Sequence, residues 1–215
     1  MPYDLIVFDW DGTLMDSIGT IVACAQRALA DLELPAAQDY EIRDLVGLRL
    51  STIAGRLVGG DAELAGRFVE IYSYHWRHTF HGDALPVAAA GSTLDALEGR
   101  GHMMAVATGK SRRGLESDFE RLDFRRFFAT SRTVDESPSK PSPAMLLEIM
   151  DELGTRPAST LMIGDTTHDV LMAVSAGVEV VGVLTGSHDA DRLRSAGAAV
   201  CLDHVGQLVD WLDAR

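Results

Sequence analysis

Cysteines, basic residues and long apolar runs are scarce in this chain of 215 residues, and each scarcity excludes a class of protein. The two cysteines, Cys24 and Cys201, lie among apolar neighbours, so we expect reduced, buried thiols and no disulfide framework. No stretch approaches the roughly 18 apolar residues that cross a membrane. Met1 to Asp4 lack the basic start and the apolar stretch of a signal peptide. We therefore expect a cytoplasmic protein.

Acidic residues outnumber basic ones by 32 to 19, which gives a formal net charge of −13. A surface of that sign repels nucleic acid and anionic membranes, so we expect neither as a partner. Binding of a phosphate ester then needs local positive charge, which a divalent cation and a lysine could supply. Apolar residues make up 47% of the chain, enough for a packed core, and a monomer is compatible with these numbers.

An apolar strand opens the chain, and an all-helical block follows it. Tyr3 to Asp9 contain a continuous apolar run, as in a strand buried on both faces. Residues 16–80 have apolar side chains at helical spacing and no convincing strand, and residues 81–86 form a break. Beyond Pro86, helical segments alternate with short apolar runs at 103–107, 161–163, 178–183 and 198–202, with a weaker candidate at 127–130.

Strands and helices that alternate in this way predict a parallel sheet with helices on both faces. The expected fold class is α/β: a doubly wound, Rossmann-like core interrupted after its first strand by a helical cap. We assign residues 1–15 and 83–215 to the core and residues 16–82 to the cap. Ligands of such sheets bind beyond the carboxyl ends of the strands, so the polar residues at those ends form the candidate site.

Asp9 and Asp11 follow the first strand, in a segment that continues through Gly12 to Thr13. Two carboxylates at one strand end can share a metal and divide two tasks. An ionised one can attack phosphorus and form an aspartyl phosphate, and a protonated one can deliver a proton to the leaving oxygen. A free aspartate has a pKa near about 3.9, but a neighbouring negative charge raises that pKa. The alternative is a pair of turn-forming aspartates.

Thr108 and Gly109 follow the strand expected at 103–107. A hydroxyl beside a bare glycine amide suits the oxygens of a phosphate group. The segment imitates the end of a nucleotide-binding P-loop, but that motif needs a glycine where this chain has Met104. We therefore expect Lys110 to be a solvated residue that opens the next helix.

Lys140 comes shortly before a helix expected at 143–153. Alone it would be a surface charge, but beside the other segments its ammonium could neutralise a nucleophile and a phosphoryl group. Asp165 and Asp169 follow a later strand and are four residues apart, so at a helix start they share one face. An ordinary N-cap would explain Asp165 alone, whereas two carboxylates beside Asp9 indicate Mg²⁺.

Four ordered segments resemble the motifs of the haloacid dehalogenase superfamily: Asp9 to Thr13, Thr108 with Gly109, Lys140, and Asp165 with Asp169. The resemblance spans nearly the whole chain. The helical insert is similar to the small cap of the superfamily's first cap class, and the nearest group is the phosphoglycolate phosphatase-like one. Asp11 favours phosphate chemistry, because the dehalogenases of the superfamily need no protonated leaving oxygen and lack an acid there.

The resemblance implies a role for each residue of the first three segments. Asp9 would be the nucleophile. Asp11 would be the general acid and base and would give its backbone carbonyl to the metal. Thr108 and Gly109 would hold the phosphoryl group, and Lys140 would steady it together with Asp9.

In the fourth segment, the resemblance implies that Asp165 ligates Mg²⁺ directly, alongside Asp9 and Asp11. Asp169 would support the metal from behind these ligands or through water. The implied activity is that of a Mg²⁺-dependent phosphoric monoester hydrolase acting on a small-molecule phosphate ester, with phosphoglycolate the leading candidate substrate.

The spacing of His75, His78 and His81 does not put all three on one helical face, so we expect a polar helix end and no zinc site. Arg49 is a candidate cap residue for reaching the substrate, and the alternative is an ordinary surface arginine. We expect His168 to face solvent and Trp10 to pack beside the first motif without a chemical role.

Other functions are compatible with parts of this pattern. A sugar-phosphate mutase of the same superfamily, similar to β-phosphoglucomutase, would return the phosphoryl group to a sugar, and a pyrophosphatase would use the same core. A signalling receiver domain also places aspartates, a threonine and a lysine on a doubly wound sheet, but it is much shorter and has no cap. A non-catalytic binding protein would lack a catalytic residue, and none is missing.

Overall fold

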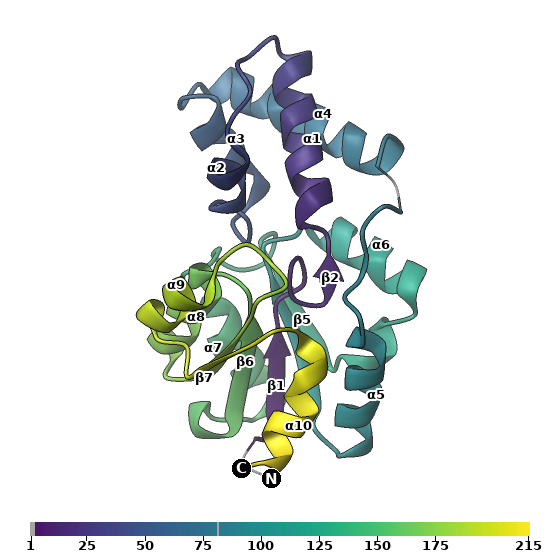
Figure 1. Ribbon diagram of the computed structural model, residues 1–215, viewed down its shortest axis with the longest axis vertical. Coiled ribbons are helices and arrows are strands. Elements are labelled where there is room, and N and C mark those ends of the chain that lie inside the picture. Colours follow the sequence, from purple (N-terminus) through teal and green to yellow (C-terminus); the bar gives the residue numbers. More distant parts are fainter. Residues whose placement is uncertain (1–2, 81) are drawn as a thin grey trace.

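Six parallel strands form the central sheet, in the order β5-β4-β1-β6-β7-β8 (Figure 1). The structure is a computed structural model that describes residues 3–80 and 82–215. The strands are β1 Leu5–Phe8, β4 Met103–Thr108, β5 Thr130–Thr133, β6 Thr160–Gly164, β7 Glu179–Val183 and β8 Val200–Leu202. β1 pairs with β4 on one side and β6 on the other. The sheet is the doubly wound α/β core that the sequence predicts.

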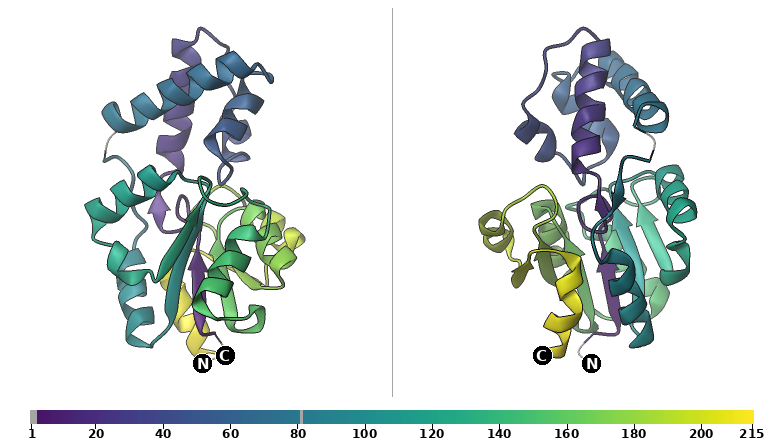
Figure 2. Two further views of the ribbon diagram at one scale, coloured as in Figure 1. Left: turned by 180° about the vertical axis from the view of Figure 1, so that it is seen from behind. Right: turned by 45° about the vertical axis from the view of Figure 1, so that its right-hand side comes forward.

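Helices cover both faces of the sheet, because successive strand residues point to opposite sides. Ile6 and Phe8 belong to the apolar core shared with α5, α6 and α10, whereas Leu5 and Val7 belong to the core shared with α7, α8 and α9. Figure 2 shows these helices on either side of the strands. Their bounds are α5 Ala90–Gly99, α6 Arg112–Leu122, α7 Ala144–Leu153, α8 Thr167–Ala176, α9 Ala190–Ala196 and α10 Leu208–Asp213. Short 3₁₀ turns lie at Arg125–Phe127, Pro157–Ser159 and Val205–Gln207.

The strand expected at 127–130 is wrong. A 3₁₀ turn ends at Phe127, and β5 begins only at Thr130. Phe127 and Phe128 are apolar because they pack into the core, whereas β5 lies at the edge of the sheet and has a polar sequence. The other five strands lie where the sequence predicts them.

Four further helices form a layer beyond the carboxyl ends of the strands (Figure 1). They are α1 Ile18–Asp31, α2 Asp39–Arg43, α3 Leu50–Leu57 and α4 Ala62–His78. Their apolar faces make a core of their own, which includes Leu29, Ile42, Ala54 and Phe68. These helices therefore pack on each other around an apolar core that contains no residue of the sheet.

Two short segments connect this layer to the sheet. The chain leaves through β2 (Met15–Asp16) and returns through β3 (Leu85–Pro86), and the two pair antiparallel. The expectation of no strand over residues 16–80 is wrong at its first residue, because two-residue strands show no apolar periodicity. Part of the break expected at 81–86 forms β3, and His81 lies outside the described residues.

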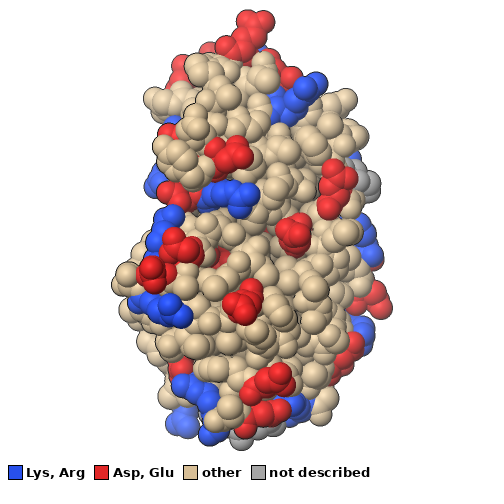
Figure 3. Space-filling model, in the orientation of Figure 1, with Lys and Arg blue, Asp and Glu red and all other residues tan. Residues whose placement is uncertain are grey.

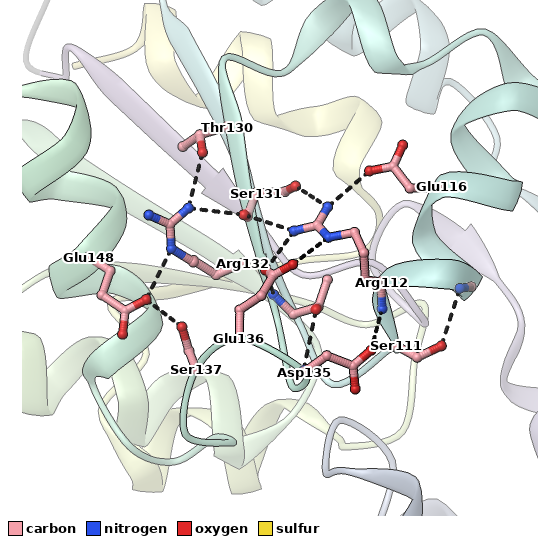
Figure 4. Close-up of polar contacts among 12 residues, drawn as sticks. Ser111, Arg112, Glu116, Thr130, Ser131, Arg132, Asp135, Glu136, Ser137 and Glu148 are labelled. Carbon is pink, nitrogen blue, oxygen red and sulfur yellow. Dashed lines mark hydrogen bonds and ion pairs between the residues drawn. The ribbon is translucent and has the colours of Figure 1, made fainter.

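Two arginines fix the loop that leads from β5 to Lys140 (Figure 4). Arg112 donates from Nε and Nη2 to the two carboxylate oxygens of Glu136, at 2.6 and 2.7 Å. Arg132 donates from Nε to Glu148 of α7 at 3.0 Å. The Glu136 pair ties the loop to α6, and the Glu148 pair ties β5 to α7, so Lys140 enters the site from a well-anchored backbone.

Acidic and basic side chains are interspersed on the face of the molecule shown in Figure 3. Within the described residues, no helix is long and apolar enough to span a membrane. Cys24 is buried, as expected, and both thiols are free. Cys201 is partly exposed, so the expectation of a buried thiol is wrong there, because β8 lies at an edge of the sheet.

Candidate active site

Asp9 and Asp165 stand side by side because β1 and β6 do. The Asp9 N–H donates to the Ile163 carbonyl at 2.9 Å. The sheet extends from β1 to β5 on one side and from β6 to β8 on the other, and doubly wound sheets bind ligands at such a switch point. Both carboxylates are buried there, at 1% and 0% exposure.

Lys140 lies between two carboxylates, with Nζ 2.6 Å from Asp9 Oδ1 and 2.6 Å from Asp169 Oδ1. Burial alone would lower the pKa of Lys140, but the charges of Asp169 and Asp9 outweigh burial and raise that pKa. The ammonium therefore stays charged beside Asp9. Burial and the charge of Asp169 raise the pKa of Asp9 well above its ordinary value, while Lys140 acts in the opposite sense.

The start of α8 holds Asp169 in place. Its Oδ2 accepts hydrogen bonds from the N–H of Thr166 at 3.1 Å and from Thr166 Oγ1 at 2.6 Å. Thr166 is the N-cap, and its Oγ1 accepts from the Asp169 N–H at 3.3 Å in return, which completes a capping box. The expectation that Asp165 and Asp169 share a helix face is wrong, because Asp165 precedes the N-cap. The two carboxylates converge nonetheless, since they and Asp9 offer oxygens that all lie within 4.8 Å of one another.

Two donors orient the carboxylate of Asp165. Thr13 Oγ1 donates to Oδ1 at 3.0 Å, and the Ser187 N–H donates to Oδ2 at 2.9 Å. The backbone approaches this carboxylate so closely at Gly12 and Gly186 that a Cβ at either position would overlap it. Both positions therefore require glycine. Burial, followed by the charge of Asp169, raises the pKa of Asp165 to about 7.

These residues fit a magnesium ion. Asp9 Oδ2 is buried and has no hydrogen-bond partner within residues 3–80 and 82–215. When ionised, Asp9, Asp165 and Asp169 carry three negative charges against the single positive charge of Lys140. The excess of two negative charges matches a divalent cation, and carboxylate oxygens are the ligands that Mg²⁺ prefers.

Asp11 makes polar contacts outside this cluster. Its Oδ1 accepts from Ser17 Oγ at 2.8 Å and lies 3.3 Å from Lys110 Nζ. The same Nζ lies 3.3 Å from Asp118 Oδ2 and 4.4 Å from the centroid of the Trp76 ring. The expectation of a solvated Lys110 is therefore wrong, because two carboxylates and an aromatic face stabilise its ammonium in a side chain only 9% exposed. Metal ligation by the backbone carbonyl of Asp11 stays a prediction.

Thr108 and Gly109 lie at the end of β4, under the cap. Thr108 is 1% exposed, and its Oγ1 accepts from the Lys110 N–H at 3.1 Å, which leaves the hydroxyl proton to be donated. A Cβ at Gly109 would overlap the carbonyl of Gly47 in the cap. The backbones of cap and core thus meet directly over the residues expected to hold phosphate.

A cavity of about 630 Å³ separates the rest of the cap from the core. Asp9, Asp11, Thr108 and Gly109 line its core side. Arg49 lines the cap side, where it is the N-cap of α3. It is exposed, and its N–H donates to Ser139 Oγ at 3.3 Å. The arrangement can hold a phosphate group against Asp9 and the rest of an ester in the cavity.

The structure also places Trp10, His168 and His75, for each of which the sequence predicts an environment. Trp10 packs as expected, fully buried, with Nε1 donating to Asp118 at 2.9 Å. His168 does not simply face solvent, since its Nε2 lies 3.1 Å from the backbone carbonyl of Asp44 in the cap. His75 contacts Asp31 at 2.7 Å.

The expectation of a polar helix end at His75, His78 and His81 is only partly open to comparison, because His81 lies outside the described residues.

Sequence reasoning missed the contacts of Thr13, Ser17 and Asp118. Thr13 belongs to the first motif, and a hydroxyl in the turn after Asp9 was a usable signal. Asp118 offers no signal, because its contact with Lys110 depends on how α6 folds back over the loop before it.

Comparison with known proteins agrees with this geometry. A family model described as haloacid dehalogenase-like hydrolase matches residues 6–183. The chain is 34% identical over 212 residues to a probable phosphatase, IndB, of Dickeya dadantii (strain 3937), covering 95% of this chain and 91% of that protein. It is 26% identical over 215 residues to a phosphoglycolate phosphatase of Vibrio vulnificus (strain YJ016), covering 96% and 94%. The crystal structure of a hydrolase from Pseudomonas syringae matches with a TM-score of 0.88 at 25% identity over 97% of each chain.

Proposed function

The chain belongs to the haloacid dehalogenase-like hydrolases, and from this premise we propose that it is a Mg²⁺-dependent phosphatase that hydrolyses a small phosphate monoester through a phosphoryl group carried on Asp9. The observation that supports this most is the buried cluster of Asp9, Lys140 and Asp165. A carboxylate with one unpartnered oxygen, a fixed ammonium 2.6 Å away and a second carboxylate suit phosphoryl transfer, in which positioning and charge neutralisation dominate.

In the first step, a carboxylate oxygen of Asp9 attacks phosphorus. A bond forms between that oxygen and phosphorus, and the bond between phosphorus and the ester oxygen breaks. Asp11 donates its proton to the leaving oxygen, so the alcohol departs neutral. Thr108 and the N–H of Gly109 would bind phosphoryl oxygens, and Lys140 would offset their charge.

In the second step, a water molecule attacks the phosphorus of the phosphoryl group on Asp9. Asp11, now ionised, accepts the proton of that water. The bond between phosphorus and the Asp9 oxygen breaks, which releases inorganic phosphate and restores both carboxyl groups. The net reaction consumes one ester and one water and gives one alcohol and one phosphate.

Asp9, Asp165 and the carbonyl of Asp11 would hold Mg²⁺, with Asp169 behind them. The positive charge of the bound Mg²⁺ would offset the negative charges of the carboxylates and of the phosphoryl group. We further propose that residues 16–82 act as a cap domain on a core of residues 1–15 and 83–215. The separate apolar core of the cap helices supports this division.

The test is hydrolysis of a panel of phosphate monoesters, beginning with phosphoglycolate, with Mg²⁺ and again with chelator. We expect chelator to abolish turnover and Asp9→Asn to lower kcat by at least about a thousandfold. Asp191→Asn is the matched control, because the Asp191 side chain is fully exposed. Undiminished hydrolysis by Asp9→Asn would overturn the covalent mechanism, and formation of a sugar-phosphate isomer without free phosphate would indicate a mutase.

A further inference from the structure

The cavity above Asp9 is large for a small ester. Its volume of about 630 Å³ lies in the middle of the range of roughly 300–1,000 Å³ that holds drug-sized ligands. A two-carbon phosphate such as phosphoglycolate would fill a small part of this space. The shape of the site therefore leaves room for a leaving group of considerably more atoms.

The cap side of the cavity is mainly apolar and aromatic. Ile21 of α1, Val46 before α3, and Tyr72 and Trp76 of α4 all line it. The Tyr72 and Trp76 rings are nearly parallel, at 13°, with centroids 6.3 Å apart. Phe68, one turn earlier on α4, extends this row into the core of the cap at 6.2 Å from Tyr72. Tyr72 and Trp76, two of the three aromatic cap residues that line the cavity, are therefore supported from behind by the packing of the cap.

Groups that would recognise a sugar are scarce on this wall. Among the described cap residues that line the cavity there is no Asp, Glu, Asn, Gln or His, and the side chains that can form hydrogen bonds are two arginines, two serines, the Tyr72 hydroxyl and the Trp76 indole N–H. Sugar hydroxyls that face Ile21, Val46 and the ring faces of Tyr72 and Trp76 would find no hydrogen-bond partner there, and each unsatisfied group costs free energy. A flat ring would bury apolar surface against Tyr72 and Trp76 and could pack on them face to face or edge to face.

The aromatic wall also lies next to the predicted acid. Lys110 Nζ is 4.4 Å from the Trp76 ring centroid and 3.3 Å from Asp11 Oδ1. The leaving oxygen must come within reach of Asp11 to receive a proton. If a short spacer joins the leaving oxygen to a ring, the ring therefore reaches Tyr72 and Trp76.

We propose, on the basis of the hydrolysis assigned above to Asp9, that the preferred substrate is a phosphate monoester of an alcohol that carries a flat aromatic or heteroaromatic ring. Tyr72 and Trp76 bind the ring, and they set the specificity against two-carbon acids and plain sugars.

The test compares benzyl phosphate with ethyl phosphate, which are both esters of primary alcohols and differ by the ring. We expect wild-type kcat/KM to be at least about tenfold higher for benzyl phosphate, the discrimination that an apolar pocket gives against a missing apolar group. Phosphoglycolate and glucose 6-phosphate should fall with ethyl phosphate. Cyclohexylmethyl phosphate separates ring flatness from size and should lie between the two.

Substitutions at Tyr72 test whether the aromatic side of the cavity causes the preference for benzyl phosphate. Tyr72→Leu should reduce the ratio of benzyl to ethyl kcat/KM by about threefold to tenfold, the contribution of an aromatic pair beyond its area, and Tyr72→Phe should keep the ratio. Tyr40→Leu makes the same change at an exposed cap position that does not line the cavity, and it should leave both rates unchanged.

The outcomes separate this inference from the proposed hydrolysis. Turnover of ethyl phosphate or phosphoglycolate equal to or above that of benzyl phosphate overturns the ring preference and leaves the phosphatase proposal standing. Turnover of none of these esters counts against both proposals. The wild-type ratio decides the ring preference even if Tyr72→Leu does not fold.

Discussion

Asp165 and Asp9 make the site sensitive to pH. Burial and the charge of Asp169 raise the pKa of Asp165 to about 7 and raise that of Asp9 in the same direction. Between about pH 4, where a free aspartate ionises, and about pH 7, the folded metal-free protein therefore holds protons that the unfolded chain has lost. The free energy of unfolding consequently falls as pH rises through this window.

We expect Mg²⁺ to raise the melting temperature more at about pH 8 than at about pH 6, because bound protons must leave before the cation binds. For each proton released, the apparent Kd for Mg²⁺ should fall by up to about tenfold per pH unit below about pH 7. Thermal unfolding measured over a Mg²⁺ titration at several pH values gives both quantities.

The matched variants for this measurement are Asp165→Asn and Asp191→Asn. The first should remove the Mg²⁺-dependent shift in melting temperature, and the second should leave it unchanged. A shift of equal size at all pH values, or one that persists in Asp165→Asn, would show that the cation binds elsewhere.

Two lysines show how far single residues can be interpreted from sequence. The expectation of Lys140 near the nucleophile rested on the motifs around it, and the structure places its Nζ 2.6 Å from Asp9. Lys110 stands next to a predicted phosphate-binding segment and was expected in solvent, but it pairs with Asp11 and Asp118. The two partners of Lys110 come from different segments of the chain, so no local sequence pattern predicts these contacts.

Some strands and helix starts can be predicted from the sequence, and others cannot. Buried central strands such as β1 and β6 are continuous apolar runs, so they can be predicted from sequence alone. The edge strand β5 and the two-residue strands β2 and β3 carry no such signal, because backbone pairing rather than apolar burial defines them. Asp165 similarly lies two residues before the start of α8, because Thr166 is the N-cap of that helix.

The contact between β4 and the cap allows a test at the level of the element. A Cβ at Gly109 would overlap backbone atoms of Gly47 and Leu48, so Gly109→Ala should push the cap loop away from the core. We expect kcat/KM to fall by about tenfold to a hundredfold, as small displacements of an active site do. Steady-state kinetics together with the melting temperature checks this.

Gly91→Ala is the control for that substitution. Gly91 lies in α5, and the nearest atoms to a Cβ there are 3.7 Å away, in ordinary contact. This change should leave kcat/KM unaltered and keep or slightly raise the melting temperature. Equal activity of Gly109→Ala and wild type would mean that the cap loop does not need to meet β4 for catalysis.

The whole molecule consists of a sheet with an apolar core on each face and a layer of helices, with a core of its own, over the carboxyl ends of the strands (Figure 1). Beside the Gly47 contact, Arg192 of α9 reaches across to Asp44 of the cap at 2.6 Å. The overall architecture follows from the order of strands and helices in the sequence. The cavity between the two parts does not, because its walls come from residues distant in the chain, such as Tyr72 and Thr108.

The central claim is that Asp9 carries the phosphoryl group, and the most direct test uses Asp11→Asn with Mg²⁺ and 4-nitrophenyl phosphate. The leaving group of this ester needs no proton, so the first step should proceed while the second, which needs Asp11 as base, is slowed. We predict a burst of one nitrophenolate per chain and, after acid quench, a phosphoryl group located by peptide mass mapping on Asp9. The absence of both a burst and a phosphopeptide, or a phosphoryl group on another residue, would contradict the account.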